Sequence, residues 1–454
     1  MEYRMEHDAL GEMQVPADRW WGAQTQRSLE NFPIGDDLMP REMIRAFALL
    51  KKAVAQTNAE LGLLDERRCA LIAQVCDEIL IGVLDGHFPL SVWQTGSGTQ
   101  TNMNVNEVIA NRGNALAGKK LLHPNDTVNM SQSSNDTFPT AMHMAAAETV
   151  ERRLLPALRS AIEVCCRLEE ENRDVIKIGR THLQDATPIR FSQEISGWRG
   201  MLETSYGQIS ASAAGLYSLA LGGTAVGTGI NTPNGFDRLA AARIAALTGL
   251  PFVTEENKFH ALTAKDALSF SHGALRTLAA NMMKIANDVR WLASGPRCGI
   301  GEIRIPENEP GSSIMPGKVN PTQCESVTMV AVQVMGNDAA IAVAASQGNF
   351  QLNVFMPVII RNYLHSARLL ADSLASFTGR CLVGISADRD AMDRHLRQSL
   401  MLVTCLNGTV GYENAARAAR LAYEEGLTLE EAVLRLGLLS KERFEELAAP
   451  EKMV

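Results

Sequence analysis

The sequence predicts an all-α protein built around a long helical bundle. Aromatic residues make up only 5% of the 454-residue chain, and runs of β-branched residues are few beyond Phe138. After Thr263, apolar residues recur at a spacing of seven and then alternately of three and four, which is the seam of a helical bundle. This seam predicts a helix over about 263–294 and consists of Leu268, Leu275, Leu278, Met282, Ile285, Val289 and Leu292.

The other elements follow from helical periodicity and from helix start and stop signals. Residues 1–38 are expected to be irregular, and Pro156 is expected to kink the helix that contains it. Past residue 388 the predicted helices are short, with a capping box that begins at Thr428. The predicted helices cover roughly 40–62, 65–83, 105–116, 140–172, 192–214, 236–248, 263–294, 322–346 and 354–379.

The length of the chain exceeds what one compact core usually holds, so two or three domains are expected. The changes in pattern favour three, an N-terminal, mostly helical domain (1–131), a central bundle of long helices (132–388) and a small C-terminal helical domain (389–454). The helix at 322–346 is apolar around nearly its whole circumference, so it must be buried on all sides. In a bundle with few helices per chain, other subunits are the means of burying it, which predicts a homo-oligomer.

Composition excludes several classes of function. The net charge is -8 and no long basic block is present, which argues against nucleic acid or anionic membrane as a partner. No run is long enough to span a bilayer and the start lacks a signal-like apolar core, so a cytoplasmic protein, or a processed organelle protein, is expected. The eight cysteines and nine histidines show no metal-ligand spacing, so we expect reduced thiols and no metal or cofactor. The pair Lys51-Lys52 is interpreted as a solvated helix face.

Four polar loops stand out in this apolar chain, around Ser97, around Asn135, at Thr181-His182 and at 311–325. Their hydroxyl, amide and lysine groups suit the binding of carboxylates. A histidine provides proton transfer near neutral pH, and a glutamate would set its tautomer. Taken alone, each loop also fits a plain turn or helix cap. The glycine-rich run at 222–229 does not follow a predicted strand and lacks G-x-G-x-x-G, so a dinucleotide site is not expected.

Four long motifs occur in these loops: Gly311–Glu325 (GSSIMPGKVNPTQCE), Thr95–Asn104 (TGSGTQTNMN), Ser131–Asp136 (SQSSND) and Gly179–Ala186 (GRTHLQDA). Together they resemble the motifs of the fumarase/aspartase superfamily, and of class II fumarases in particular. The resemblance implies a three-domain, almost all-α homotetramer whose central helices form one bundle and whose active sites take loops from three subunits. It also implies reversible hydration of fumarate to L-malate, a step of the tricarboxylic acid cycle, without metal or cofactor.

The resemblance also implies a role for each motif residue. Ser312 is the expected proton-abstracting group on a mobile loop, and His182 with Glu325 is the expected charge-relay pair. A second carboxylate site is suggested by His123, Asn125 and Asp126, although Met130 stands where some fumarases have lysine. The residues expected to hold the substrate carboxylates are Ser97, Thr99, Ser133, Ser134, Asn135, Thr181, Lys318 and Asn320, with Lys318 also a catalytic cation.

Two alternatives share much of this chemistry. Aspartate ammonia-lyases have the same fold and loop types but usually carry alanine at the position of Gly317 and a different run after Pro321. A non-catalytic structural or binding member of the superfamily is the second alternative, which is disfavoured because every expected catalytic position is filled.

Overall fold

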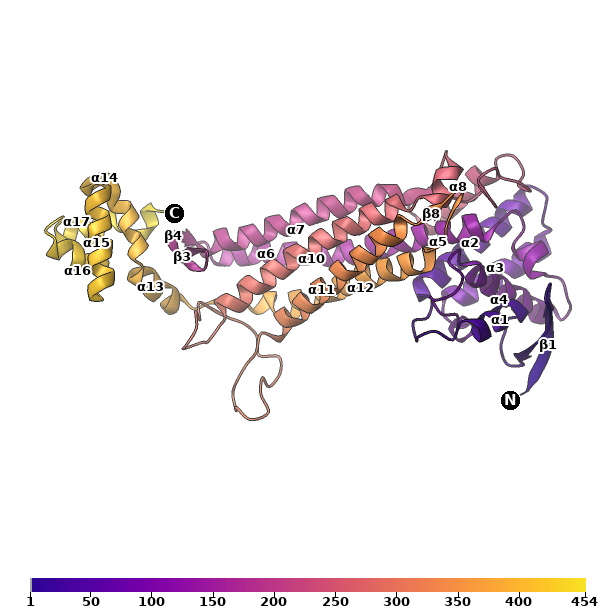
Figure 1. Ribbon diagram of the computed structural model, residues 1–454, viewed down its shortest axis with the longest axis horizontal. Helices are drawn as coiled ribbons and strands as arrows, with labels where there is room; N and C mark the ends of the chain where they lie inside the picture. Colours follow the sequence, from indigo (N-terminus) through magenta and orange to yellow (C-terminus); the bar gives the residue numbers. More distant parts are fainter. Residues whose placement is uncertain (1) are drawn as a thin grey trace. The chain divides into compact units, whose positions relative to one another are not determined.

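The structure is a computed structural model that describes residues 2–454, and α-helices dominate it (Figure 1). The chain forms two compact units. Unit 1 comprises Met1–Pro156, Gly207–Ala279 and Val332–Ala371, and unit 2 comprises Ala157–Tyr206, Ala280–Ala331 and Asp372–Val454. The all-α class predicted from the sequence is confirmed, since the strands are few and short.

The helices follow one another with short connections. In the first half of the chain they are α1 (Ala23–Asn31), α2 (Arg41–Glu60), α3 (Glu66–Leu80), α4 (Thr99–Ala117), α5 (Ser134–Thr149), α6 (Leu155–Glu171) and α7 (Phe191–Ala213). The second half holds α8 (Phe236–Thr248), α9 (Lys258–Thr263), α10 (Asp266–Leu292), α11 (Thr322–Ala345), α12 (Met356–Arg380) and the short helices α13 (Arg389–Gln398), α14 (Asn407–Val410), α15 (Tyr412–Glu425), α16 (Leu429–Arg435) and α17 (Lys441–Leu447).

The seam predicted after Thr263 is buried in α10, as expected for a bundle helix. Leu268, Leu275 and Leu278 are fully buried, and Ile285 and Val289 are exposed by no more than 2%. In unit 2, α7 and α10 are joined by the Trp198 indole, whose Nε1 donates to Asp288 Oδ2 at 2.9 Å. Pro156 was predicted to kink its helix, and the structure has one π turn, Val150–Leu154, just before this proline, between α5 and α6.

Residues 1–38 were predicted to be irregular, and this is wrong for residues 3–16, which form a hairpin, and for Ala23–Asn31, which form α1. Strands β1 (Tyr3–Asp8) and β2 (Gly11–Pro16) pair antiparallel, with Tyr3 opposite Pro16. The turn between them is closed by Asp8 Oδ1, which accepts from Leu10 N at 2.9 Å. The side chains of β1 alternate between exposed and half-buried positions, so the strand has no strong apolar face that the sequence would reveal.

A second hairpin occupies the segment that was predicted as a loop around Thr181-His182. Strand β3 (Ile176–Thr181) pairs antiparallel with β4 (Gln184–Arg190), which leaves two residues in the turn. Ile178 of β3 is fully buried in a core with Leu396 and Leu406 of the C-terminal helices. The apolar run is too short for periodicity to distinguish strand from loop, so packing against α13 and the following turn decides the conformation.

The remaining strands are two-residue pairings that fix loops. They are β5 (Ser218–Leu219) with β6 (Val253–Thr254), β7 (Ile303–Arg304) with β10 (Ser386–Ala387) and β8 (Gly348–Asn349) with β9 (Leu352–Asn353). Only the β5–β6 pair is parallel. The C-terminal helices α13–α17, yellow in Figure 1, pack around an apolar core that includes Leu402, Val433 and Phe444.

Within residues 2–454, helix α11 is the one helix long and apolar enough to cross a membrane by length and composition alone, so the expectation that no run reaches this length is wrong. Core helices of soluble bundles pass the same test. In the single chain only 33% of its most apolar window is buried. Val327 and Val334 lie inside, whereas Met329, Val332 and Val343 are 62–67% exposed. One chain therefore does not supply the complete burial that this helix was predicted to have.

Candidate active site

Two helix N-termini meet in unit 1, and three hydroxyl groups connect them. Ser97 Oγ lies 2.9 Å from Thr99 Oγ1 at the start of α4. Thr99 Oγ1 lies 2.8 Å from Ser134 Oγ, the first residue of α5. Free N–H groups and the helix dipole make such ends attractive to anions. The structure therefore brings together two of the predicted carboxylate-binding loops, which are 35 residues apart in the sequence.

Glycine makes this approach possible. Gly98 has a φ of +71°, and a Cβ built there would lie 2.0 Å from Cδ2 of the Phe138 ring. A Cβ at Gly96 would lie 1.5 Å from the carbonyl oxygen of Val354. Both contacts are far inside van der Waals distance, so no side chain fits at either position. Helix α4 can start at Thr99, against α5, only because these two residues are glycines.

The start of α5 is held by a capping box. Ser133 N donates to Asp136 Oδ1 at 3.0 Å, and Ser133 Oγ accepts from Asn135 N at 3.3 Å. The second oxygen of Asp136 accepts from the N–H groups of Gly222 and Thr224, both at 2.9 Å. Burial raises the pKa of Asp136 to about 6, although these N–H donors oppose the shift. The Asp136 carboxylate thus ties the glycine-rich segment 222–229 to the N-terminus of α5.

Asn135 points toward the same segment, since its Nδ2 donates to the carbonyl of Ala225 at 2.8 Å. A cavity of about 520 Å³ opens at these helix ends. It is lined by Thr99, Ser133 and Ser134 of the predicted set, and by Thr224 and Ala225. The sequence analysis missed the glycine-rich run as part of the site, because only the folded chain brings it to the N-terminus of α5.

Lys51 of α2 lies beside this cavity and is 1% exposed, so its interpretation as part of a solvated face is wrong. Its Nζ donates to Asn102 Oδ1 at 2.7 Å, Gln132 Oε1 at 2.8 Å and Asn129 Oδ1 at 3.2 Å. Burial lowers the pKa of Lys51 to about 7, although the nearby charge of Asp136 opposes this. The sequence did contain a signal for the burial of Lys51, because this lysine lies within the apolar face of a predicted helix.

The three residues of the suggested second carboxylate site form a turn at the edge of unit 1. His123 precedes a π turn (Pro124–Val128), and its Nδ1 accepts from Asp126 N at 3.2 Å. The His123 and Asp126 side chains are 46% and 81% exposed. Asn125 lines the cavity described above. The turn therefore uses His123 as a helix-type cap, and Asn125 is the one member that faces the cavity.

The loop around Ser312 lies in unit 2 and folds back on itself. Gly311 N donates to the carbonyl of Lys318 at 2.8 Å, and Asn320 Nδ2 donates to the carbonyl of Gly311 at 2.6 Å. The Ser312 Oγ accepts from Ile314 N at 3.2 Å and from Met315 N at 3.0 Å. Two N–H donors on one hydroxyl oxygen favour its anionic form. Ser312 is half-buried, while the tip of the loop is exposed, with Ile314 at 83%.

Lys318 and Asn320 line a second cavity, of about 1100 Å³, which lies entirely within unit 2. Arg290 and Arg297 line the same cavity, as do Glu307 and Asp388, so its wall carries charges of both signs. Gly317 has a φ of +80°, and nothing lies within 4 Å of a Cβ built on it. The turn before Lys318 is therefore set by the conformation that glycine allows and not by crowding.

Thr181, His182 and Glu325 also belong to unit 2. His182 and Leu183 form the turn of the β3–β4 hairpin with φ values of +57° and +61°. Glu325 lies in the first turn of α11, and both His182 and Glu325 are exposed. Within the described chain, no hydrogen bond or ion pair joins these two side chains. One chain thus presents both members of the predicted relay pair to solvent without pairing them.

A buried cluster of ion pairs at the β3–β4 hairpin, centred on Glu302, was also missed from the sequence. Glu302 is fully buried and pairs with Arg180, two residues before His182. Its only signal was a glutamate in a short segment between two predicted elements, which is too weak to single it out. Among residues 2–454 no group of three or more His, Cys, Asp or Glu side chains is arranged to hold a metal ion.

Comparison with known proteins agrees with the fold. A family profile described as "Lyase" matches residues 11–336, and one described as "Fumarase C C-terminus" matches residues 402–454. Together with the long helices and the polar helix ends, these matches define the class of the protein as a lyase.

The full-length relatives narrow the class. A fumarate hydratase class II of Campylobacter jejuni is 59% identical over 459 residues, covering 100% of this chain and 99% of the relative. One of Bacillus subtilis is 58% identical over 458 residues with the same coverage. The solved class II fumarase of Schistosoma mansoni superposes with a TM-score of 0.97 at 42% identity, over 100% of this chain and 99% of that one. The chain belongs to the class II fumarate hydratase family.

Proposed function

We propose that this protein catalyses the reversible hydration of fumarate to L-malate, a step of the tricarboxylic acid cycle. The observation that carries the proposal is the convergence of Ser97, Thr99 and Ser134 on two helix N-termini. Hydroxyl and N–H donors at helix ends suit a small dicarboxylate. Full-length identity of 57–59% to several class II fumarate hydratases supports the same reaction.

The proposed mechanism is an anti elimination or addition of water through an aci-carboxylate. Removing a proton next to a carboxylate places two charges on its oxygens, so donors must be aimed at them. Each such donor contributes about 2.7–4 kcal/mol in a preorganised site. Lys318 is the proposed cation, and Asn320, Thr181, Ser133 and Asn135 complete the proposed set of donors to the substrate carboxylates.

Ser312 is the proposed base. Serine is a weak base in water, so its oxyanion needs N–H donors and a desolvated loop. The contacts from Ile314 N and Met315 N are of the required kind. A general base contributes about 10²–10⁴-fold to the rate.

We further propose a cytoplasmic homotetramer in which His182 of one chain pairs with Glu325 of another. The exposed apolar residues of α11, such as Met329 and Val332, support burial by neighbouring chains. The unpaired state of His182 and Glu325 in the single chain supports a shared site. The division into three domains at 1–131, 132–388 and 389–454 remains part of this proposal, as does catalysis without metal or cofactor.

One assay tests the proposed reaction. The purified protein is incubated with L-malate or with L-aspartate, with and without chelator, and the ultraviolet absorbance of fumarate is followed. We expect fumarate from L-malate at a rate that chelator does not change. Fumarate from L-aspartate alone would instead indicate an aspartate ammonia-lyase, no product from either would indicate a non-catalytic protein, and loss with chelator would contradict the metal-free mechanism.

A further inference from the structure

The turn that presents His182 is conformationally unusual. His182 and Leu183 both have positive φ, at +57° and +61°, and neither is glycine. A left-handed conformation of such residues is strained and persists only where the surroundings impose it. The imidazole itself has no hydrogen-bond partner in the described chain. The position of this imidazole must therefore come from the strands of the hairpin.

Strand β3 is anchored by one carboxylate. The guanidinium of Arg180 donates to Glu302 through both of its ends, at 2.9 Å to Oε2 and 2.6 Å to Oε1. A bidentate pair of this kind fixes the plane of the guanidinium and its distance from the carboxylate. Arg180 is adjacent to Thr181 and two residues before His182. Glu302 thus holds the end of β3, where Arg180 and Thr181 are the last paired residues before the turn of His182.

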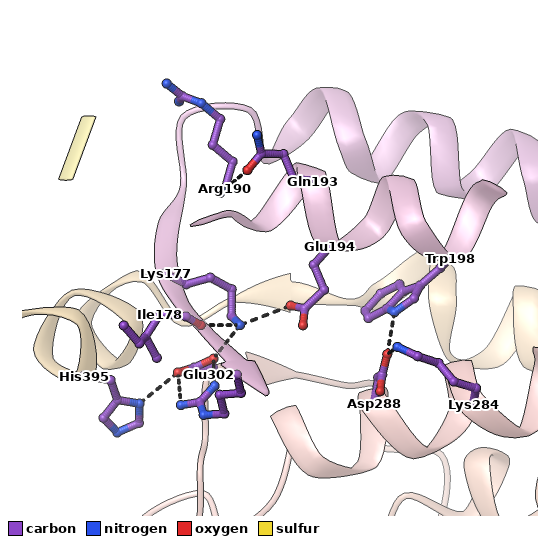
Figure 2. Close-up of polar contacts among 11 residues, drawn as sticks. Lys177, Ile178, Arg190, Gln193, Glu194, Trp198, Lys284, Asp288, Glu302 and His395 are labelled. Atoms are coloured by element: carbon purple, nitrogen blue, oxygen red, sulfur yellow. Dashed lines mark hydrogen bonds and ion pairs between the residues drawn. The ribbon is translucent and has the colours of Figure 1, made fainter. Parts of the chain in front are cut away.

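Glu302 also holds other elements of unit 2 (Figure 2). The Nζ of Lys177, at the other end of β3, lies 3.3 Å from Glu302 Oε2 and 3.2 Å from Glu194 Oε2 of α7. His395 of α13 donates from Nδ1 to Glu302 Oε1 at 3.0 Å. In the backbone, Glu302 N donates to Leu292 O and Asp388 N donates to Glu302 O, both at 2.8 Å. One residue joins β3, the end of α10 and the start of α13.

The cost of this arrangement argues for a geometric role. Glu302 and Lys177 are 0% and 1% exposed. Burial would raise the pKa of Glu302, but the hydrogen bond from Arg180 and the charge of Lys177 hold the pKa below its ordinary value. Buried ion pairs seldom stabilise a fold more than apolar side chains of the same volume would. What they provide is a fixed relative position of the segments that they join.

We propose that Glu302 is a positioning residue, which acts through Arg180 to hold the turn of His182 in its left-handed conformation. The C-terminal helices take part through His395 of α13 and through the packing of Ile178 against Leu396. These helices then serve the reaction by fixing a turn that they do not contain. The inference rests on the role proposed above for His182.

The test compares Glu302→Gln with a matched control in steady-state kinetics with L-malate. Asp174→Asn is the control, because Asp174 forms a bidentate pair with Arg389 at 2.7 and 3.0 Å and also joins the hairpin region to α13. That pair is exposed, and Asp174 precedes the start of β3, at the opposite end of the strand from the turn. We expect Glu302→Gln to lower kcat about 10–100-fold with little change in KM, since small displacements of catalytic groups cost this much. Asp174→Asn should keep the wild-type kcat.

A double-variant cycle separates positioning from general damage. If Glu302 acts through His182, Glu302→Gln should cost no further activity in a His182→Asn background. Losses that multiply, or a Glu302→Gln enzyme with wild-type kcat, would overturn the proposal. Should Glu302→Gln fail to fold, Arg180→Lys keeps the charge without the bidentate geometry, and it should lower kcat in the same way.

Hydrogen exchange tests the proposal independently of the reaction. Peptides that span residues 180–184 should exchange faster in Glu302→Gln than in the wild type and in Asp174→Asn. Unchanged exchange in this peptide would contradict a positioning role even if the protein had no activity on L-malate. Absence of wild-type activity, by contrast, would contradict the proposed function and leave the exchange result to decide the role of Glu302.

Discussion

Ser312 is the residue on which the proposed chemistry depends most directly. Its oxygen already accepts from Ile314 N and Met315 N. Replacing Ser312 by alanine removes the proposed base, and we expect kcat for L-malate to fall about 10²–10⁴-fold with a smaller change in KM. Steady-state kinetics checks this, with Ser313→Ala as the control because Ser313 is the neighbouring, exposed hydroxyl of the same loop. A Ser312→Ala enzyme with near-wild-type kcat would rule out this base.

Lys51 makes stability depend on pH in a definite direction. Its pKa is lowered by burial to about 7 from 10.5, so between these values the unfolded chain binds more protons than the folded chain. The free energy of unfolding should therefore rise with pH above 7, by at most about 1.4 kcal/mol per pH unit from this group. Below pH 7 the folded state bears the full cost of the buried charge.

The measurement is urea unfolding of Lys51→Met from pH 7 to pH 9. This variant should be less stable than the wild type, because three amide oxygens lose their donor. Its stability should also rise less steeply with pH, although not stay flat, because burial lowers the pKa of Lys265 to about 7 as well. Lys52→Met is the control, since Lys52 is the next residue and pairs with Asp77, which is 55% exposed. A Lys51→Met protein whose stability rises with pH as steeply as that of the wild type would contradict the buried-lysine assignment.

At the scale of elements, Gly98 decides how α4 meets α5. Alanine at Gly98 would both occupy a positive φ and place its Cβ against the Phe138 ring, 2.0 Å away. Gly118, at the other end of α4, also has a positive φ of +66°, but nothing lies within 4 Å of a Cβ there. We expect Gly98→Ala to destabilise the protein by about 1–3 kcal/mol more than Gly118→Ala, the cost of overpacking, and to raise KM for L-malate. Denaturant unfolding and kinetics of the two variants check this, and equal effects would contradict it.

The same elements show how far sequence reasoning reaches. The long bundle helices were predictable because their apolar residues repeat over many turns, as Leu275, Leu278 and Met282 do in α10. The start of α4 was not predictable, because Asn102 and Asn104 are buried polar residues that interrupt the apolar pattern. Their burial depends on partners far along the chain, such as Lys51 for Asn102. The local spacing of apolar residues does not reveal such distant partners.

In the candidate site, too, local patterns could be predicted and distant partners could not. Its motif residues could be identified because they are dense in polar groups within short stretches, as in 311–320. The supporting residues could not, because Glu302 and Asp136 act through tertiary contacts with segments more than 80 residues away. A short hairpin such as β3–β4 escapes prediction for a related reason, since Ile178 gains its burial from the C-terminal helices.

At the scale of the whole molecule, the exposed apolar side of α11 and the unpaired relay residues point to the same requirement for further copies of the chain. Met329, Val332 and Val343 are 62–67% exposed in one chain, which is unusual for a helix as apolar as α11. Association by a closed symmetry would bury this side in every copy at once. Sedimentation at low micromolar concentration should therefore show a tetramer, and a stable, active monomer would contradict the proposed assembly.

Hybrid tetramers test whether the active site is shared. A His182→Asn chain keeps the hydroxyl cluster of Thr99, and a Thr99→Val chain keeps the imidazole of His182. An equal mixture of the two variants is dissociated and allowed to reassociate. If each site takes His182 from one chain and Thr99 from another, about a quarter of wild-type activity should return. Half of the chains that supply His182 are intact, and so are half of the chains that supply Thr99, so about one site in four has both residues. Each variant treated alone should stay inactive. If both residues came from one chain the mixture would regain nothing, although wild-type protein recovered fully from the same treatment.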